Sequence, residues 1–421
     1  MKSLPFLSGL TLVLLSACVP NQPLPPTPPP PPAVPAPDPG PQRLPTLDSL
    51  LPAPPEVVGM HPMLGVTLDS VVEAGLADGA APGAAVAVGR YSRLVHLRGY
   101  GRIDTPPNAP EVTPRTLFDL ASLTKVVGTT TAAMILEERG MLDLDRTVAS
   151  YLPEFNDSTK AEITVRMLLT HSGGLEAFAP LYQDFSGREQ YLEQINERPL
   201  EYEPGTATIY SDWDFVLMAL VIEEITGMPL NWFLEDNVFG PLGMVDTGFR
   251  PDLALRPRIA ATEVDKERGL IWGEVHDPNA FAIGGVAGHA GLFSTAHDLA
   301  IFAQMMLNGG EYGGVRILEP ATIARWTARQ GPDASRALGW DTPSGRSSSG
   351  HYASARSFGH TGYTGTSLWI DPERGLFTIL LTNRVNPTAA NQRHVQLRRD
   401  VADAVQKAIL DAPLIDWESA R

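Results

Sequence analysis

The stretch Leu120-Ala121-Ser122-Leu123-Thr124-Lys125 places a serine three residues before a lysine, ahead of an apolar segment that reaches Gly140. This pattern predicts a helix that begins near Ser122. Because residues i and i+3 share a helical face, the Lys125 amine can lie beside the Ser122 hydroxyl. A serine attacks well only when a base takes its proton, and a partly buried lysine can be that base because burial disfavours its charged form. The helix start also offers unpaired N–H groups that suit an oxyanion.

A Ser-x-x-Lys pattern also arises by chance, about once or twice in a chain of this length with average composition. This chain is poor in lysine, however, and only Lys125 has a serine three residues earlier; its lysines are Lys2, Lys125, Lys160, Lys266 and Lys407. An unpaired lysine would also be costly beside so apolar a segment. We therefore interpret Ser122 and Lys125 as candidate catalytic residues.

Composition limits the class of protein. The chain has 421 residues, of which 43% are hydrophobic and 19% charged, and its formal net charge is −16. This balance allows a large core and argues against nucleic acid or an anionic membrane surface as a charge-driven partner. The single cysteine, Cys18, excludes an internal disulfide framework and a cysteine-based zinc site. We predict no cofactor and no metal.

The N-terminal part predicts export and anchoring. Residues 1–17 have a basic start, a short apolar run and small residues, which is typical of a signal peptide. The end of this segment, Leu15-Ser16-Ala17-Cys18, resembles a bacterial lipobox, so we expect Cys18 to carry lipid and to hold the protein at the cell envelope. The alternative is an ordinary cleaved signal with an incidental cysteine. Residues 18–60 include the run Pro28 to Pro32 and predict an extended tether; a proline-rich recognition site is the alternative.

Residues 61–415 predict one α+β domain. Apolar spacing predicts a helix over 63–78 and another over 397–410, and strand patterns occupy 84–88, 94–100, 357–362, 366–370 and 376–382. The sheet part therefore spans about 61–120 and 335–415, with both ends of the chain in one antiparallel sheet flanked by helices. The inserted part, about 121–334, is predicted to be mostly helical, with helices over 164–169, 213–226 and 296–307 and a glycine-rich loop over 284–291.

Two further motifs follow Ser122 along the chain. They are Tyr210-Ser211-Asp212, just before the apolar 213–226 segment, and Gly359-His360-Thr361-Gly362-Tyr363, at the opening of a late strand. With Ser-x-x-Lys, this order resembles the penicillin-recognising serine hydrolases: class C β-lactamases, D-alanyl-D-alanine carboxypeptidases and related esterases. The resemblance covers about Met63 to Leu410 and implies a β-lactamase/transpeptidase-like fold.

The resemblance also implies roles. Ser122 would form an acyl-enzyme, Lys125 and Tyr210 would shuttle its proton, and the N–H groups of Ser122 and Tyr363 would form the oxyanion hole. His360, Thr361 and Gly362 would meet the acidic end of the substrate. His171 and His289 are expected to be structural. The chain has neither His-Glu-x-x-His nor Gly-x-Ser-x-Gly, so a zinc protease or an α/β-hydrolase has no support.

Two positions depart from the family pattern. His360 stands where the family has lysine, and a mostly neutral histidine grips a carboxylate less firmly. Asp212 stands where the family has asparagine. An ionised Asp212 would favour the ammonium form of Lys125, leave Tyr210 as the base and prefer substrates that present N–H groups or positive charge; alternatively it only caps the following helix.

The predicted substrates are small esters or D-amino-acid peptides, of which a peptidoglycan stem peptide is one. A β-lactamase, or a non-hydrolytic penicillin-sensing or wall-binding module, are the alternatives.

Overall fold

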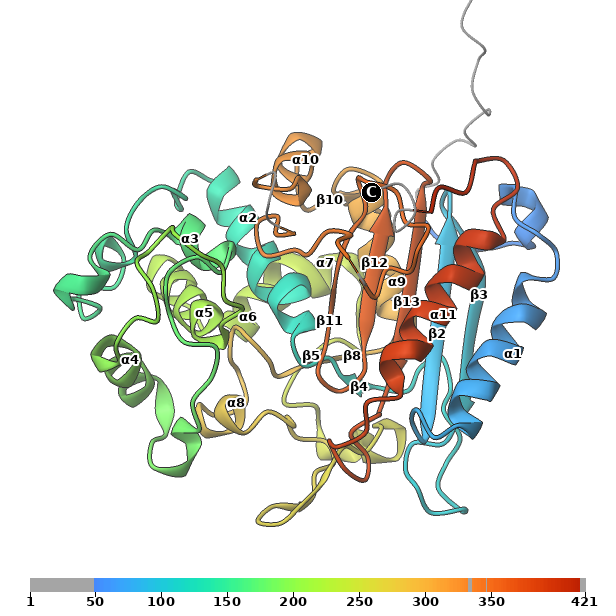
Figure 1. Ribbon diagram of the computed structural model, residues 1–421, viewed down its shortest axis with the longest axis horizontal. Coiled ribbons are helices and arrows are strands. Elements are labelled where there is room, and N and C mark those ends of the chain that lie inside the picture. The colour runs from blue at the N-terminus through green and yellow to red at the C-terminus, as the bar shows by residue number, and fades with distance from the viewer. Residues whose placement is uncertain (1–48, 332–334, 346, 417–421) are drawn as a thin grey trace, which may run out of the picture. The chain divides into compact units, whose positions relative to one another are not determined.

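The computed structural model describes residues 49–331, 335–345 and 347–416, and a six-stranded sheet brings the two ends of this part together (Figure 1). The strand order is β1-β3-β2-β13-β12-β11. Their bounds are β1 Leu51–Pro52, β2 Gly83–Arg90, β3 Arg93–Gly101, β11 Phe358–Thr361, β12 Ser367–Asp371 and β13 Leu376–Thr382. The predicted strands are therefore present, and β13 agrees with its prediction to the residue.

The sheet is mixed, so the prediction of an antiparallel sheet was wrong at one edge. All other neighbours are antiparallel, but β1 pairs in parallel with β3, with Leu51 opposite Arg93. An edge strand tolerates Pro52 because one side of it makes no ladder hydrogen bonds. Nearby, Val58 and Met60 are buried against the sheet. The folded domain thus begins before position 61, within the segment that we had assigned to the tether.

Helices cover both faces of the sheet. Helices α1 (Leu64–Ala77) and α11 (His394–Lys407) lie side by side over one face (Figure 1), while α9 (Ala296–Leu307) packs against β2 and β13 in the other core. Strand β2 is buried along its whole length. Its alternate side chains divide between the two cores, with Val86 and Val88 facing α1 and α11 and Ala85 and Ala87 facing the opposite core, as the two-residue repeat of a strand requires.

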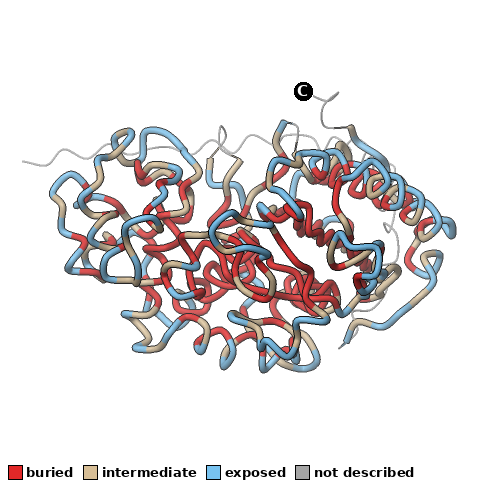
Figure 2. The backbone as a smooth tube through the Cα atoms, turned by 90° about the horizontal axis from the view of Figure 1, so that it is seen from below, coloured by how far each residue is buried: buried red, intermediate tan, exposed pale blue. Residues whose placement is uncertain are grey.

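The inserted part is mostly helical, as predicted, with short strands between the helices. Figure 2 shows buried residues concentrated in its interior and exposed residues along the outer loops. Its helices are η2 Lys125–Thr130, α2 Thr131–Glu138, η3 Val148–Ser150, η4 Ser158–Lys160, α3 Val165–Leu169, η5 Leu181–Gln183, α4 Gly187–Glu197, α5 Asp212–Thr226, α6 Leu230–Leu234, η6 Glu235–Phe239, α7 Gly240–Leu242, η7 Leu253–Arg258, α8 Pro278–Ala282 and α10 Pro320–Thr327, and a further turn, η1 Pro55–Val58, precedes α1. The short strands are β4 Phe118–Asp119, β5 Gly248–Phe249, β6 Val264–Asp265, β7 Gly269–Leu270, β8 Leu292–Ser294, β9 Glu311–Tyr312 and β10 Val315–Arg316.

Two helices of this part position the site. The segment η2 is a π-helix that continues directly into α2, a geometry that is rare and often found at functional sites. Helix α5 begins at Asp212 after an N-cap by Ser211, whose Oγ accepts from the Trp213 N–H, and it ends at Gly227 in the left-handed conformation. No helix in the described ranges is both long and apolar enough to cross a membrane.

Candidate active site

The turn that carries Ser122 is held in a strained conformation. Ala121 adopts a φ of 45°, which costs energy for a residue with a side chain. The Asp119 carboxylate offsets this cost, since it accepts hydrogen bonds from the N–H of Ala121 (2.8 Å) and of His276 (2.7 Å). Burial raises the pKa of Asp119 against the opposing effect of these two N–H groups. The backbone that leads into Ser122 is thereby held between the end of β4 and the start of the helix.

Lys125 is fully buried, and each N–H donor of its ammonium group has an acceptor. Its Nζ lies 3.1 Å from Ser122 Oγ, 2.7 Å from Asp212 Oδ1 and 3.2 Å from the His289 carbonyl oxygen, which matches its three donors. Burial alone would lower the pKa of Lys125, but the Asp212 carboxylate and the Tyr210 hydroxyl outweigh it, so that this pKa lies above its ordinary value. The ammonium form of Lys125 is therefore favoured, as we expected beside an ionised Asp212.

Asp212 directs its carboxylate to Lys125 and not to the helix start. The two form an ion pair in which the Lys125 side chain is fully buried and Asp212 keeps 18% of its exposure. The capping function belongs to Ser211, whose Oγ lies 3.2 Å from the Trp213 nitrogen. The alternative in which Asp212 only caps α5 is thus wrong.

Tyr210 lies in the middle of the site, surrounded by cations and histidines. Its ring centroid is 4.8 Å from Lys125 Nζ and 5.2 Å from the guanidinium carbon of Arg336. The His171 and His360 rings lie on it with centroid distances of 4.6 and 5.8 Å. The structure thus brings Ser122, Lys125 and Tyr210 together.

His171 holds the chain on both sides of Tyr210. Its carbonyl oxygen accepts from the Ile209 N–H (3.0 Å), and its Nδ1 accepts from the Ser211 N–H (3.3 Å). Asp214 Oδ2 lies 2.7 Å from the same Nδ1. Because this nitrogen already accepts, the proton of the pair resides on Asp214. Burial raises the pKa of Asp214 well above its ordinary value and lowers the pKa of His171 well below its own, in agreement with a neutral pair.

The predicted substrate-binding motif lies at the end of edge strand β11. His360 is buried and its Nδ1 donates to the Thr361 carbonyl oxygen at 2.8 Å. Burial, with help from the charges of Arg336 and Lys125, lowers the pKa of His360 well below its ordinary value. The neutral histidine that we expected is therefore present, and it brings no positive charge to a substrate carboxylate.

The N–H groups of Ser122 and Tyr363 donate to no other group within the described part of the chain, so both are available to an oxyanion. Two arginines hold the turn that carries Tyr363. Arg384 Nε donates to the Tyr363 carbonyl oxygen at 2.6 Å, and Arg398 donates to the carbonyl oxygens of Gly362 and Thr366. Burial and the neighbouring Arg384 lower the pKa of Arg398 to about 9. The turn is thus fixed by buried cations.

These residues line one cleft of about 420 Å³. It contains Ser122, Tyr210, His360, Thr361, Gly362, Tyr363, Arg336, Asp341, Arg384, Gln392, His394, Val395 and Arg398. A larger groove of about 580 Å³ lies between α1 and α11, but it contains none of the predicted site residues. The smaller cleft is therefore the candidate active site.

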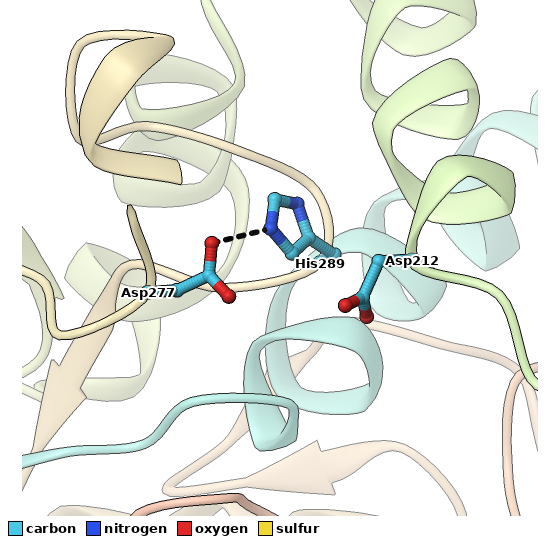
Figure 3. Close-up of side chains that lie close together, drawn as sticks. All are labelled: Asp212, Asp277 and His289. Carbon is cyan, nitrogen blue, oxygen red and sulfur yellow. Dashed lines mark hydrogen bonds and ion pairs between the residues drawn. The ribbon is translucent and has the colours of Figure 1, made fainter. Parts of the chain in front are cut away.

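Asp212, Asp277 and His289 form the one group in the described ranges whose oxygens and nitrogen could together hold a metal ion, within 4.8 Å of one another (Figure 3). His289 Nε2 lies 3.0 Å from Asp277 Oδ1. Burial alone would raise the pKa of Asp277, but His289 outweighs it and lowers this pKa to about 2. Because the Lys125 ammonium already neutralises Asp212 and would repel a metal ion, the donor set fits an ion-pair network better than a metal centre.

Sequence reasoning missed three residues near the site: Asp119, Asp277 and Arg336. An aspartate inside the apolar run 117–120 is a signal that could have indicated Asp119, since a buried carboxylate needs partners. Asp277 precedes Pro278, which marks a helix start, but nothing local relates it to His289. Arg336 lies in an irregular segment without any motif.

A mixed sheet between helices, with Ser122 and Tyr210 in one cleft and Lys125 buried beside Ser122, is the architecture of a serine hydrolase. A sequence model of the Beta-lactamase family matches residues 68–403, and the chain belongs to that family. A relative from Salmonella agona, named "Putative D-alanyl-D-alanine carboxypeptidase", is 38% identical over 313 residues, which cover 67% of this chain and 72% of the relative.

Two solved structures have the same fold. One is titled "EstCE1, a hydrolase with promiscuous acyltransferase activity"; it matches 82% of this chain and 98% of its own with a TM-score of 0.67 at 23% identity. The other, a β-lactamase/D-alanine carboxypeptidase from Pseudomonas syringae, matches 81% and 98% with a TM-score of 0.66 at 19% identity. The predicted α+β fold and the predicted family are therefore confirmed.

Proposed function

We propose that this serine hydrolase cleaves esters or D-amino-acid peptides through an acyl-enzyme on Ser122. One observation carries the proposal: a single buried ammonium, Lys125 Nζ, lies within hydrogen-bond distance of both Ser122 Oγ and Asp212. The name of the 38% identical relative supports a D-alanyl-D-alanine peptide as substrate, and a peptidoglycan stem peptide contains one.

The charges of the site support Tyr210 as the base of the proton transfer. Because Lys125 is an ammonium ion, it donates to Ser122 Oγ and orients it, and the phenolate form of Tyr210 takes the serine proton. Ser122 Oγ then bonds to the substrate carbonyl carbon, whose oxygen takes the negative charge next to the free N–H groups of Ser122 and Tyr363.

Collapse of this intermediate breaks the bond to the leaving amine or alkoxide, which takes the proton back from Tyr210. Water then attacks the acyl carbon and gives a proton to Tyr210; as the bond from this carbon to Ser122 Oγ breaks, Oγ takes that proton from Tyr210 and a carboxylic acid leaves. All atoms and protons of the two half-reactions are thus accounted for without a cofactor.

The test combines a fluorescent penicillin, followed in time, with a panel of small esters and D-alanyl-D-alanine peptides. We expect ester or peptide turnover in the wild type and none in Ser122→Ala, with unchanged thermal stability. A transient label would indicate β-lactam hydrolysis, and a persistent label without any turnover would indicate a penicillin-sensing module. If neither esters nor peptides are cleaved, or if Ser122→Ala keeps wild-type turnover, the proposal is wrong.

We also propose that the protein is exported and attached to the cell envelope through lipid on Cys18. The support is the lipobox-like sequence that ends at Cys18; this residue and the proline-rich segment after it, up to residue 48, lie outside the described residues. A single lipid chain binds a membrane only weakly, so several acyl chains on one cysteine would be needed for stable attachment. Cys18→Ser should move the protein from the membrane fraction to the soluble fraction, and an unchanged distribution would contradict the anchor.

A further inference from the structure

We propose that the Arg336 guanidinium stabilises ionised Tyr210. It is needed because the Asp212 carboxylate neutralises the positive charge of Lys125. The inference rests on the proposed function, because it concerns the proton transfer from Ser122. Arg336 would act through Tyr210, so it is a positioning residue and not a catalytic one. The geometry of the cleft, the charges that face Tyr210 and the anchoring of the segment around Arg336 support it separately.

Three arginines line the cleft, and they differ in what their guanidinium groups contact. Arg384 and Arg398 donate to main-chain carbonyl oxygens of the Tyr363 turn and of nearby loops. Arg336, in contrast, donates no side-chain hydrogen bond to any residue of the described ranges; within those ranges it forms one ion pair, with Asp341 at 3.9 Å. Its guanidinium carbon lies 5.2 Å from the Tyr210 ring centroid. Arg336 is thus the cleft arginine whose charge is directed at Tyr210.

The other groups around Tyr210 contribute little positive charge. The Lys125 ammonium is 2.7 Å from the Asp212 carboxylate, so the pair has no net charge. His171 and His360 also face the ring, but burial lowers the pKa of both well below its ordinary value, and both are neutral. A phenolate beside a neutral pair and two neutral rings needs a further cation.

Two acids near this cluster reduce the charge of Arg336 only in part. Asp214 is buried behind His171 and holds its proton, since burial raises its pKa well above the ordinary value. Asp341 lies beside Arg336, and burial raises its pKa as well. Neither therefore cancels the guanidinium as closely as Asp212 cancels Lys125.

The segment that carries Arg336 is anchored, so this position is not accidental. Asp341 exchanges two backbone hydrogen bonds of 2.9 Å with Gly359 of β11, and Gly339 donates to the Leu169 carbonyl oxygen at 2.8 Å. Trp340 is fully buried, with its ring edge on Phe358 at 4.9 Å. Asp341 in turn forms a β-bridge with Arg336, so the strand that presents His360 holds the backbone at Arg336.

The experiment compares Arg336→Gln and Arg336→Lys with Arg325→Gln, which removes an equal charge from an exposed arginine that pairs with Glu137. The ionisation of Tyr210 is followed directly by NMR of 13Cζ-tyrosine, with Tyr210→Phe used to assign its signal among ten tyrosines. The pH profile of kcat is measured on the best ester of the panel.

We expect Arg336→Gln to move the ionisation of Tyr210 and the acid limb of kcat upward by about half to one pH unit, with about a three- to tenfold loss at pH 7. Arg336→Lys should recover most of this loss, and Arg325→Gln should behave as wild type. In an Asp212→Asn background, no carboxylate neutralises Lys125, so Arg336→Gln should shift the ionisation of Tyr210 and lower kcat by less.

Three results would overturn the inference: an unchanged Tyr210 titration in Arg336→Gln, a rise in KM with unchanged kcat and acid limb, which would assign Arg336 to substrate binding, or an undiminished effect in the Asp212→Asn background. If the wild type cleaves no ester or peptide, the proposed function fails, but the NMR titration still decides whether Arg336 stabilises ionised Tyr210.

Discussion

Asp212 and Asp214 begin the same helix two residues apart, yet they form pairs of opposite character. Asp212 stays partly exposed and forms an ion pair with Lys125. Asp214 is 1% exposed and shares a proton-bearing hydrogen bond with neutral His171. The partner and the access to solvent decide the difference: an amine strong enough to stay protonated keeps a carboxylate charged, whereas a buried imidazole does not. The charged pair thus orients Ser122 through Lys125, and the neutral pair holds the chain that carries Tyr210.

Breaking the charged pair should have the largest effect. Lys125→Met removes the ammonium that contacts Ser122 and Tyr210, and we expect kcat to fall by about 10³-fold or more. Lys160→Met is the matched control, because Lys160 is equally buried but donates to the Asn196 carbonyl oxygen, away from the cleft. It should lower thermal stability and leave kcat unchanged. Equal losses of kcat in both variants would contradict a specific role for Lys125.

The neutral pair of Asp214 and His171 should change how the free energy of unfolding depends on pH. Folded Asp214 holds its proton because its pKa is raised, while the unfolded chain loses that proton above about pH 3.9. The wild type therefore loses up to about 1.4 kcal/mol of stability per pH unit from this group until the raised folded-state pKa is reached.

Asp214→Asn keeps a donor for His171 and has no such loss. Its stability relative to wild type, from denaturant unfolding at several pH values, should rise with pH above about 4. A constant difference would mean that Asp214 is ionised in the folded state. Asp214→Ala, which leaves His171 without its partner, should be about 1–3 kcal/mol less stable than Asp214→Asn at every pH.

Removing the negative charge of Asp212, so that it is neutral like Asp214, should have a moderate effect. Asp212→Asn leaves Lys125 without its counter-charge, so we expect about a tenfold change in the ratio of penicillin acylation to ester turnover and a shifted pH profile of kcat. The penicillin label and the ester assay measure both. If only thermal stability changed, the ion pair would have no part in substrate preference.

The smallest expected effect separates the capping role of Ser211 from the ion-pair role of Asp212. Ser211→Ala removes the Oγ that accepts from the Trp213 N–H, and we expect a loss of about 1 kcal/mol in the free energy of unfolding. The acid limb of kcat should not move, because neither pair loses a charge. A stability loss of this size in Asp212→Asn, but not in Ser211→Ala, would return the capping role to Asp212.

Local signals in the sequence predicted most of the fold. Helix α9 was placed to the residue because Thr295 caps it and its apolar face is continuous, and β13 because a run of buried residues ends at polar turns. Strand β1 was missed because a two-residue strand beside prolines has no pattern of its own. The parallel pairing of Leu51 depends on β3, forty residues later.

The site residues that belong to short sequence motifs could be predicted. Ser122, Lys125, Tyr210 and His360 stand in motifs, and all of them come together in one site. Arg336 and Asp277 reach the site only through the tertiary fold, so no spacing could indicate them. The charge of Lys125 was open as well, because burial and Asp212 act on it in opposite directions and only their distances decide the balance.

The π-helical turn over Lys125–Thr130 affects which deletions the protein can tolerate. A π-turn holds one residue more than the α-helical turn that it interrupts, so it behaves as an insertion preserved in the backbone. Deleting one residue here would close the π-turn to an α-helical turn and change the direction of the side chains within it. The bond from Thr129 Oγ1 to the Gly288 carbonyl oxygen, which ties the helix to the glycine loop, depends on that direction. In this segment, single-residue deletions should therefore be lost from the gene far more readily than conservative substitutions.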